Sequence, residues 1–204
     1  MPMNKPNALL ALAFPVVLTI GILLIPVVAD YGDHTLAENA AAQTLRWAAG
    51  HLLSAAAFGL GALACGVLYV ELLQRKTPIS SLAVLFSALG AGLYAAGLGI
   101  DGIGPLIMQA AGVPASAFFD ASGWWVTGTF MVATLLWGIG LIWLVAATTR
   151  SELVKGNLGY GVGFGVLLML GAPVIPSGWG LYGVALGCWM VFGTIGFRLV
   201  KNLT

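Results

Sequence analysis

The sequence predicts an all-α integral membrane protein, a compact bundle of six transmembrane helices whose N- and C-termini are both cytoplasmic. Three observations lead there. Hydrophobic residues make up 60% of the 204 positions, only 7% of the positions are charged, and apolar stretches of bilayer-spanning length recur along the chain. Soluble domains carry about 25% charged residues. This composition therefore excludes a soluble monomer, and it also excludes a disordered chain, which requires low hydrophobicity and high charge.

Six stretches qualify, or nearly qualify, as membrane spans, since a spanning helix needs about 20 apolar residues. None has a charged residue in its middle. Their apolar runs are continuous rather than alternating, which favours helices over the strands of a β-barrel. The predicted spans are Ala8–Ala29, Leu45–Leu73, Ser80–Ile100, Trp124–Thr149, Leu158–Ile175 and Trp179–Leu199.

The first stretch resembles a signal peptide, because Lys5 precedes it and Val27-Val28-Ala29 resembles a cleavage site. Its apolar run of 22 residues, however, exceeds the roughly 7–15 residues of a signal-peptide core. We therefore expect this stretch to be a retained transmembrane helix.

Short links join several of the spans into hairpins and leave no room for a soluble domain. Residues 74–79 and 150–157 connect spans on the predicted cytoplasmic side, and residues 176–178 form a tight outer turn. The chain is thus expected to be a single six-span domain over residues 1–204. Near the inner end of the second span, Glu71 and Arg75 have the spacing of a helical ion pair.

Two outer links are longer than the others. In the first, Asp30–Thr44, the sequence Thr35-Leu-Ala-Glu predicts a capping box at the start of a short helix. The second, Asp101–Gly123, is mostly apolar but is interrupted at Pro105 and Pro114. We expect it to form a broken interfacial segment between spans three and four.

The basic residues predict the orientation. Seven of the eight fall on one side of the predicted spans, whereas Arg46 lies on the other side with five of the seven acids. The positive-inside rule assigns the basic side to the cytoplasm, so the acidic loops would face the periplasm of a bacterial inner membrane. A net charge of +1 without a basic patch argues against nucleic acid as a partner. The basic residues on the predicted cytoplasmic side are Lys5, Arg75, Lys76, Arg150, Lys155, Arg198 and Lys201.

Glycine is unusually frequent, at 29 of 204 residues, about twice the usual share of about 7%. Many glycines lie four residues from another small residue, a spacing that lets membrane helices approach closely. We expect them to pack the bundle internally, with the alternative that some of these faces dock other subunits. The helix-packing glycines are Gly61, Gly66, Gly92, Gly159, Gly161, Gly163, Gly165, Gly183 and Gly187.

The seven tryptophans divide into two predicted groups. Those near the outer ends of spans are typical of an aromatic belt at the membrane interface. The deeper ones predict core or lipid contacts, or alternatively contact with a ring-shaped cofactor, pigment or quinone. The outer group is Trp47, Trp124, Trp125 and Trp179, and the deeper group is Trp137, Trp143 and Trp189.

Chemistry is concentrated in the outer half, where both histidines lie. Three interpretations are open: a metal site of the zinc class, an acid–base site that pairs Asp101 or Asp120 with a histidine, or a structural arrangement in which Arg46 offsets the acids. His51 alone would be enough to hold some tetrapyrroles. The possible ligand or metal site comprises His34, Glu38, Arg46, His51, Asp101 and Asp120.

No catalytic motif, soluble domain or mid-membrane charge is visible, so the first hypothesis is a non-catalytic polytopic subunit or accessory protein of a larger membrane complex. The alternatives are a membrane enzyme or a metal-, tetrapyrrole- or quinone-binding protein with its site at the outer face, and a channel or transporter for a small neutral solute. Membrane lipids and other membrane subunits are the expected partners. The sequence requires no cofactor; bound lipid is expected, and a pigment, haem or quinone is an open alternative.

Overall fold

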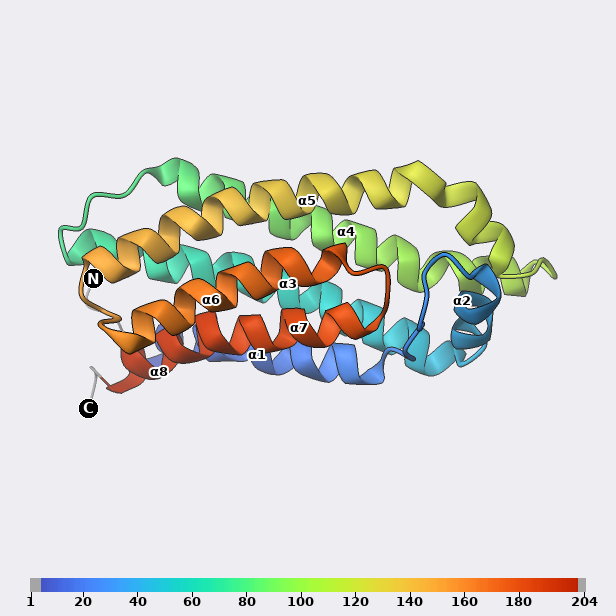
Figure 1. The fold of residues 1–204 in the computed structure, drawn as a ribbon, viewed down its shortest axis with the longest axis horizontal. Helices are drawn as coiled ribbons and strands as arrows, with labels where there is room; N and C mark the ends of the chain where they lie inside the picture. Colours follow the sequence, from blue (N-terminus) through green and yellow to red (C-terminus); the bar gives the residue numbers. More distant parts are fainter. Residues whose placement is uncertain (1–4, 202–204) are drawn as a thin grey trace.

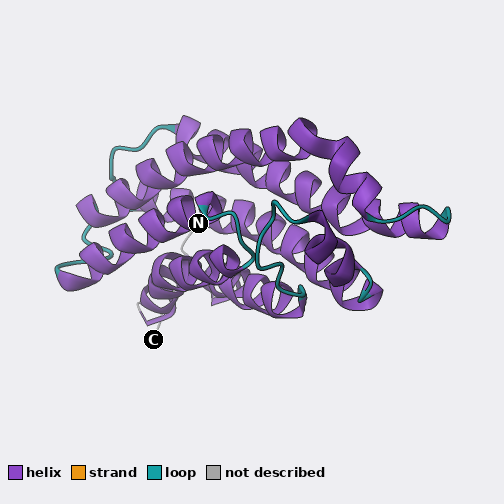
Figure 2. Cartoon of the chain, turned by 45° about the vertical axis from the view of Figure 1, so that its right-hand side comes forward, coloured by secondary structure: helices purple, strands orange, loops and turns teal. Residues whose placement is uncertain are grey.

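The computed structural model describes residues 5–201. These are 84% helical and contain no β-strand (Figure 2). The helices run back and forth along one long axis (Figure 1). In chain order the elements are α1 Lys5–Leu24, α2 His34–Ala41, α3 Thr44–Gln74, α4 Ser81–Ala110, α5 Ser116–Arg150, α6 Asn157–Gly171, the 3₁₀ turn η1 Ala172–Val174, α7 Trp179–Cys188, the π-helical turn η2 Trp189–Gly193 and α8 Thr194–Lys201.

Five helical segments are long and apolar enough to cross a membrane, which indicates a multi-pass helical membrane protein. They are α3, α4, α5, α6 with η1, and the continuous run of α7, η2 and α8. Large apolar side chains cover their flanks, among them Leu63, Leu135 and Leu167, each more than half exposed. The apolar part of α1, Ala8–Leu24, falls just short of that length.

The helices form a closed ring around an aromatic centre. Helix α1 packs on α3, α3 on α4, α4 on α5, α5 on α6 and α6 on α7, while α7 and α8 return to α1. The axis is filled by Phe14, Phe58, Trp137 and Phe192, whose contacting ring centroids are 4.9–6.1 Å apart. All four side chains are buried. The core is therefore a plug of rings contributed by α1, α3, α5 and η2.

Glycines allow the backbones of neighbouring helices to approach closely. A Cβ on Gly90 of α4 would lie 2.3 Å from the backbone nitrogen of Trp137 on α5. A Cβ on Gly140 of α5 would lie 2.5 Å from the nitrogen of Ser87. Because backbone atoms cannot move aside, only glycine fits at these crossings.

The nine glycines expected to pack helices divide into two sets. Those with neighbours from other elements at contact distance are Gly61, Gly159, Gly165, Gly183 and Gly187. Those whose Cβ would meet nothing within 4 Å are Gly66, Gly92, Gly161 and Gly163. Internal packing therefore accounts for only part of the glycine pattern, and the remainder lies on open helix faces.

The expected capping box at Thr35 is wrong. Asp33 is the N-cap of α2, and its side chain accepts hydrogen bonds from the backbone amides of Thr35 and Leu36. Asp33 has the extended backbone that an N-cap requires, with φ −96° and ψ 95°. Thr35 lies inside the helix, and Asp33, two residues earlier, is therefore the N-cap residue.

The expected broken segment at residues 101–123 is found only in part: the chain is broken at residues 111–115, which include Pro114, but most of the segment extends the two flanking helices. Helix α4 continues through Pro105 to Ala110, and α5 begins at Ser116. The only non-helical residue inside α5 is Gly123, at φ 32° and ψ −116°, which kinks the helix there. A proline removes one helical N–H, and α4 tolerates this because the carbonyl freed at Asp101 finds another donor, described below.

Charged residues collect at opposite ends of the molecule. The last turns of α5 and α8 and the loops after α3 and α5 carry the described basic residues other than Arg46, whereas α2 and its neighbouring loops carry acids at the opposite end (Figure 1). At the basic end Arg75 donates to Glu71 at 2.7 Å, which confirms the predicted helical ion pair. The side chain of Lys5 and the residues after Lys201 lie outside what the structure describes.

We predict that Gly90→Ala destabilises the bundle by about 1–3 kcal/mol, the usual cost of overpacking. Gly92→Ala on the same helix is the matched control: its new methyl group meets nothing, and alanine favours the helix by up to about 1 kcal/mol. Thermal unfolding in detergent, followed by circular dichroism, measures both. Equal melting temperatures for the two variants would contradict the proposed close approach of α4 and α5.

Candidate functional site

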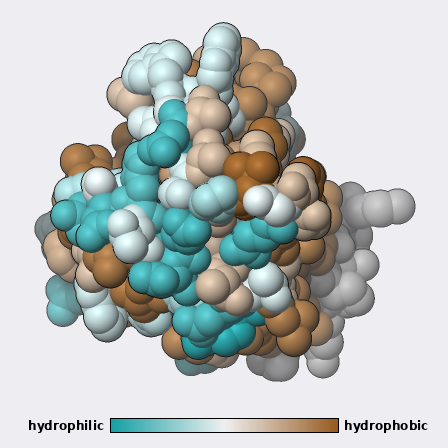
Figure 3. All heavy atoms as spheres, turned by 90° about the vertical axis from the view of Figure 1, so that its right-hand side faces the viewer, coloured by the Kyte–Doolittle hydropathy of each residue, from teal (hydrophilic) through white to brown (hydrophobic). Residues whose placement is uncertain are grey.

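The polar residues gather at the end of the molecule that carries α2. Helices α3, α4 and α5 contain 31, 30 and 35 residues, against 20 in α1. They extend past the end of α1, and α2 lies against them there (Figure 1). Viewed onto this end, hydrophilic residues form a band bordered by apolar ones (Figure 3). The site thus lies where the long helices project beyond the rest of the ring.

His51 of α3 and Asp101 of α4 face one another at this end. The Nε2 atom of His51 lies 3.5 Å from Oδ2 of Asp101. The His51 side chain is 5% exposed, whereas that of Asp101 is 25% exposed. The pair therefore has a buried imidazole on its inner side and a carboxylate that reaches the surface.

The backbone of His51's own helix determines its tautomer. Nδ1 lies 2.7 Å from the carbonyl oxygen of Trp47, one turn earlier. Because a carbonyl only accepts hydrogen bonds, Nδ1 must carry a proton. In the neutral ring, Nε2 then presents its lone pair toward Asp101. The Trp47 ring, whose centroid is 4.4 Å away, packs against the imidazole and restricts its rotation.

Trp47 also supplies a hydrogen bond in place of the one that Pro105 removes from α4. Without an N–H on Pro105, the Asp101 carbonyl four residues earlier has no helical donor. The indole Nε1 of Trp47 donates to that carbonyl at 2.9 Å. Trp47 is 4% exposed and is therefore buried within the protein, whereas Trp124, Trp125 and Trp179 are 62–81% exposed. One tryptophan thus ties α3 to α4 beside the histidine.

Two residues of this site were missed from the sequence. A Cβ on Gly102 would lie 2.6 Å from Cβ of His51, so this glycine lets α4 approach the histidine. Tyr31, from the loop after α1, lies near Asp101; burial and, second, the Asp101 charge raise the pKa of Tyr31 to about 12. In the sequence, only the Asp101-Gly102 dipeptide pointed to Gly102, and no local pattern pointed to Tyr31.

His34 and Asp120 form a separate and more exposed pair. His34, the first residue of α2, has Nδ1 2.5 Å from Oδ1 of Asp120 near the start of α5. Their side chains are 42% and 68% exposed. Water screens such a contact, and a surface pair of this kind contributes about 0–1 kcal/mol. It joins α2 to α5 by a direct hydrogen bond.

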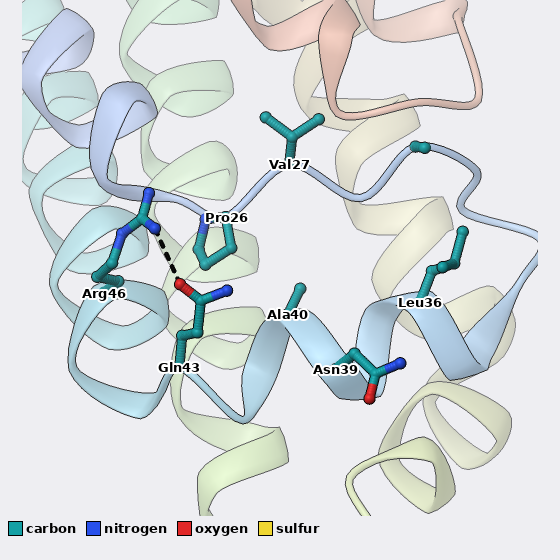
Figure 4. Close-up of a pocket in the computed structure, with 8 residues that line it drawn as sticks. Pro26, Val27, Leu36, Asn39, Ala40, Gln43 and Arg46 are labelled. Carbon is teal, nitrogen blue, oxygen red and sulfur yellow. Dashed lines mark hydrogen bonds between the residues drawn. The ribbon is translucent and has the colours of Figure 1, made fainter.

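The remaining two predicted site residues do not join either pair. Arg46 donates to Oε1 of Gln43 at 2.8 Å (Figure 4). No carboxylate pairs with Arg46 within residues 5–201, so the expectation that it offsets the acids is not met by direct contact. Arg46 instead borders an open depression of about 310 Å³, whose other wall is Pro26 and Val27 (Figure 4). Glu38 lies on α2, partly exposed.

The residues that could contact a metal or a ring-shaped cofactor are dispersed among the described elements. Among the described residues, no three or more His, Cys, Asp and Glu side chains cluster as a metal site. Of the deeper tryptophans, Trp189 donates to Oγ1 of Thr19, and Trp143 is 41% exposed. Trp137 lies inside the aromatic plug with its buried Nε1 unpaired. Cys65 and Cys188 are buried and free.

Comparison with known proteins finds no match: no family model, no curated protein and no solved structure is significantly similar to this chain.

We predict that Trp47→Phe destabilises the end of the bundle that carries α2 by about 1–3 kcal/mol, because the Asp101 carbonyl loses its donor. Trp124→Phe is the control, since Trp124 is 70% exposed. Chemical unfolding monitored by the remaining tryptophan fluorescence measures both. Equal stability of the two variants would show that the indole bond does not support the site.

We predict that Tyr31 ionises near pH 12, against the usual value of about 10. Between pH 10 and 12 the unfolded chain loses this phenolic proton while the native chain keeps it, so native stability falls as the pH rises through that window. The phenolate absorbance of wild type minus that of Tyr31→Phe isolates this group. A midpoint near 10 in the native protein would contradict the prediction.

Proposed function

We propose that the chain is a six-span protein of a bacterial inner membrane, with both ends in the cytoplasm and the α2 end facing the periplasm. The sixth span is α1, whose 20 residues reach about 30 Å at about 1.5 Å per residue, the thickness of a hydrocarbon core. Its packing against both α3 and α8 supports this. The basic end supports the orientation, because basic residues favour the cytoplasmic side.

We predict that a membrane-impermeant thiol reagent labels Thr35→Cys in intact cells and labels Ser80→Cys only after the cells are broken. Both positions are exposed, at opposite ends of the molecule. Cys65 and Cys188 are buried, so the native background is low. The reverse labelling pattern would show the opposite orientation. Labelling of both positions in intact cells would contradict the proposal that α3, which lies between them, crosses the membrane.

Within this membrane frame, we propose that the protein is a non-catalytic subunit or accessory protein that packs against other membrane helices. The observation that carries this proposal is the set of glycines on open faces. In helix interiors glycine costs about 1 kcal/mol relative to alanine. A Cβ added to Gly59, Gly66, Gly92 or Gly99 would meet nothing within 4 Å, so no close contact inside the bundle offsets that cost. A helix from another subunit would supply the missing contact.

Helix α4 offers the longest such face. Ala88, Gly92 and Ala96 recur every four residues and are exposed, and Gly99 continues the row. Leu85 and Leu89 beside them are 49–50% exposed. Small residues at this spacing with larger ones alongside form a groove that a second helix can fill, which is typical of helix pairs in membranes.

The other functions have less support from the described residues. A solute path along the ring axis would have to displace the plug of Phe14, Phe58, Trp137 and Phe192. An outer-face enzyme would need more convergent groups than two separate His–Asp pairs. The subunit proposal needs neither an open path nor a catalytic set.

We predict that the protein, extracted gently from its own membranes, runs as a defined particle that contains other polypeptides. Gly92→Leu should release it from that particle while leaving its fold intact, because the new side chain fills the α4 groove. Leu135→Trp is the control, as it enlarges a side chain that is 62% exposed on α5. Native mass spectrometry reads the outcome; a monomer or a homo-oligomer in the wild type would refute the subunit proposal.

A further inference from the structure

We propose that His51 and Asp101 form a binding site for a divalent transition-metal ion of the zinc class at the outer end of the bundle. The proposal rests on how the two side chains face one another across α3 and α4. It does not depend on the proposed subunit role, since the α4 glycine face lies on the flank of the bundle rather than at its end.

The facing atoms leave a place for a positive centre between them. The carbonyl of Trp47 keeps the proton of neutral His51 on Nδ1, so the lone pair of Nε2 points at the Asp101 carboxylate. Two lone pairs directed at each other repel unless a positive centre, a proton or a metal ion, lies between them. Neutral imidazole and ionised carboxylate are also the forms in which these side chains bind metals.

The separation fits a shared metal ion better than a hydrogen bond. Zinc–nitrogen and zinc–oxygen bonds are about 2.0–2.2 Å long, so two ligands at a tetrahedral angle lie about 3.3–3.5 Å apart. Nε2 of His51 and Oδ2 of Asp101 are 3.5 Å apart. A good N–H···O bond has its heavy atoms at about 2.9 Å, and this pair is wider than that.

The second pair at the same end shows the contrast. Nδ1 of His34 and Oδ1 of Asp120 lie 2.5 Å apart, closed by a direct hydrogen bond with no space for an ion. The same two residue types are therefore arranged in two ways within one face of the molecule. Of the two His–Asp pairs among the described residues, His51–Asp101 is the one at ligand spacing.

The surroundings hold the imidazole as a metal ligand needs to be held. A ligating histidine usually donates its other N–H to a carbonyl or carboxylate, which orients the ring. Here the Trp47 carbonyl accepts that proton and the Trp47 ring packs on the imidazole. On the other side Gly102 brings α4 to the Cβ of His51. The ring is thus held rigidly before any ion arrives.

The ligand set selects the class of ion. One imidazole nitrogen with one carboxylate suits zinc and similar ions, whereas Ca²⁺ and Mg²⁺ take oxygen ligands. No third His, Cys, Asp or Glu joins the pair among the residues the structure describes. Asp101 is 25% exposed, so water molecules would complete the coordination from the surface.

The test measures Zn²⁺ binding to the detergent-solubilised, chelator-treated full chain without an affinity tag, by equilibrium dialysis. We expect His51→Gln and Asp101→Asn each to weaken binding more than about tenfold, because loss of even an outer partner of a ligand costs about 10–100-fold. His34→Gln and Asp120→Asn are the matched controls and should bind Zn²⁺ as the wild type does. Co²⁺ in place of Zn²⁺ should give a visible absorption band that only the first two variants lose.

A second measurement protects the test against misfolded variants. Zn²⁺ should raise the melting temperature of the wild type, because an ion that binds only the native state stabilises it, and Mg²⁺ at the same concentration should not. Three results would overturn the proposal: no Zn²⁺ binding by the wild type, unchanged binding in folded His51→Gln, or loss of binding in the His34 variant alone.

Discussion

The close approach of helix backbones at glycines is the constraint on which this structure depends. Lipid is as apolar as leucine, so burial alone does not drive membrane helices together, and dispersion across tight contacts does much of that work. Gly90 and Gly140 bring α4 and α5 to backbone contact, and the ring of helices closes from such crossings. Ring closure then presses Phe14, Phe58, Trp137 and Phe192 into the centre. The charged side chains that the structure describes lie toward the two ends.

At the end of the molecule that carries α2, close helix contacts of the same kind occur among polar residues. Gly102 lets α4 approach the Cβ of His51, as Gly90 lets it approach Trp137. Pro105 frees the Asp101 carbonyl, which Trp47 satisfies from α3. The same tryptophan orients His51 through its own carbonyl. The break in hydrogen bonding at Pro105, the packing of α3 on α4 and the tautomer of His51 therefore depend on one another through Trp47. A change at Trp47 acts on helix packing and on the site together.

The open glycines and the His51–Asp101 pair serve different surfaces. Gly92 and its neighbours on α4 face outward from the flank of the bundle, where a lipid or another helix would lie. The paired side chains lie at the end, where α3 and α4 project past α1 (Figure 1). Because the two surfaces share a helix without sharing residues, α4 can bear a partner on its flank and an ion at its tip. A variant could therefore lose partner binding on the flank of α4 and still bind the ion at its end.

The sequence alone determined the membrane class and the gathering of both histidines with the acids, because composition and hydropathy can be read locally along the chain. Of the six spans that it predicted, five are long apolar helices in the structure, and α1 is shorter. The sequence also placed the Glu71–Arg75 pair, whose spacing lies within one helix. Only the tertiary structure decided which histidine meets which aspartate, and that Trp47 is buried rather than interfacial. The same holds for Gly90 and Gly92, two residues apart on α4: one faces α5 and the other faces nothing. Helix rotation and crossing decide such contacts, and these depend on residues far apart in sequence.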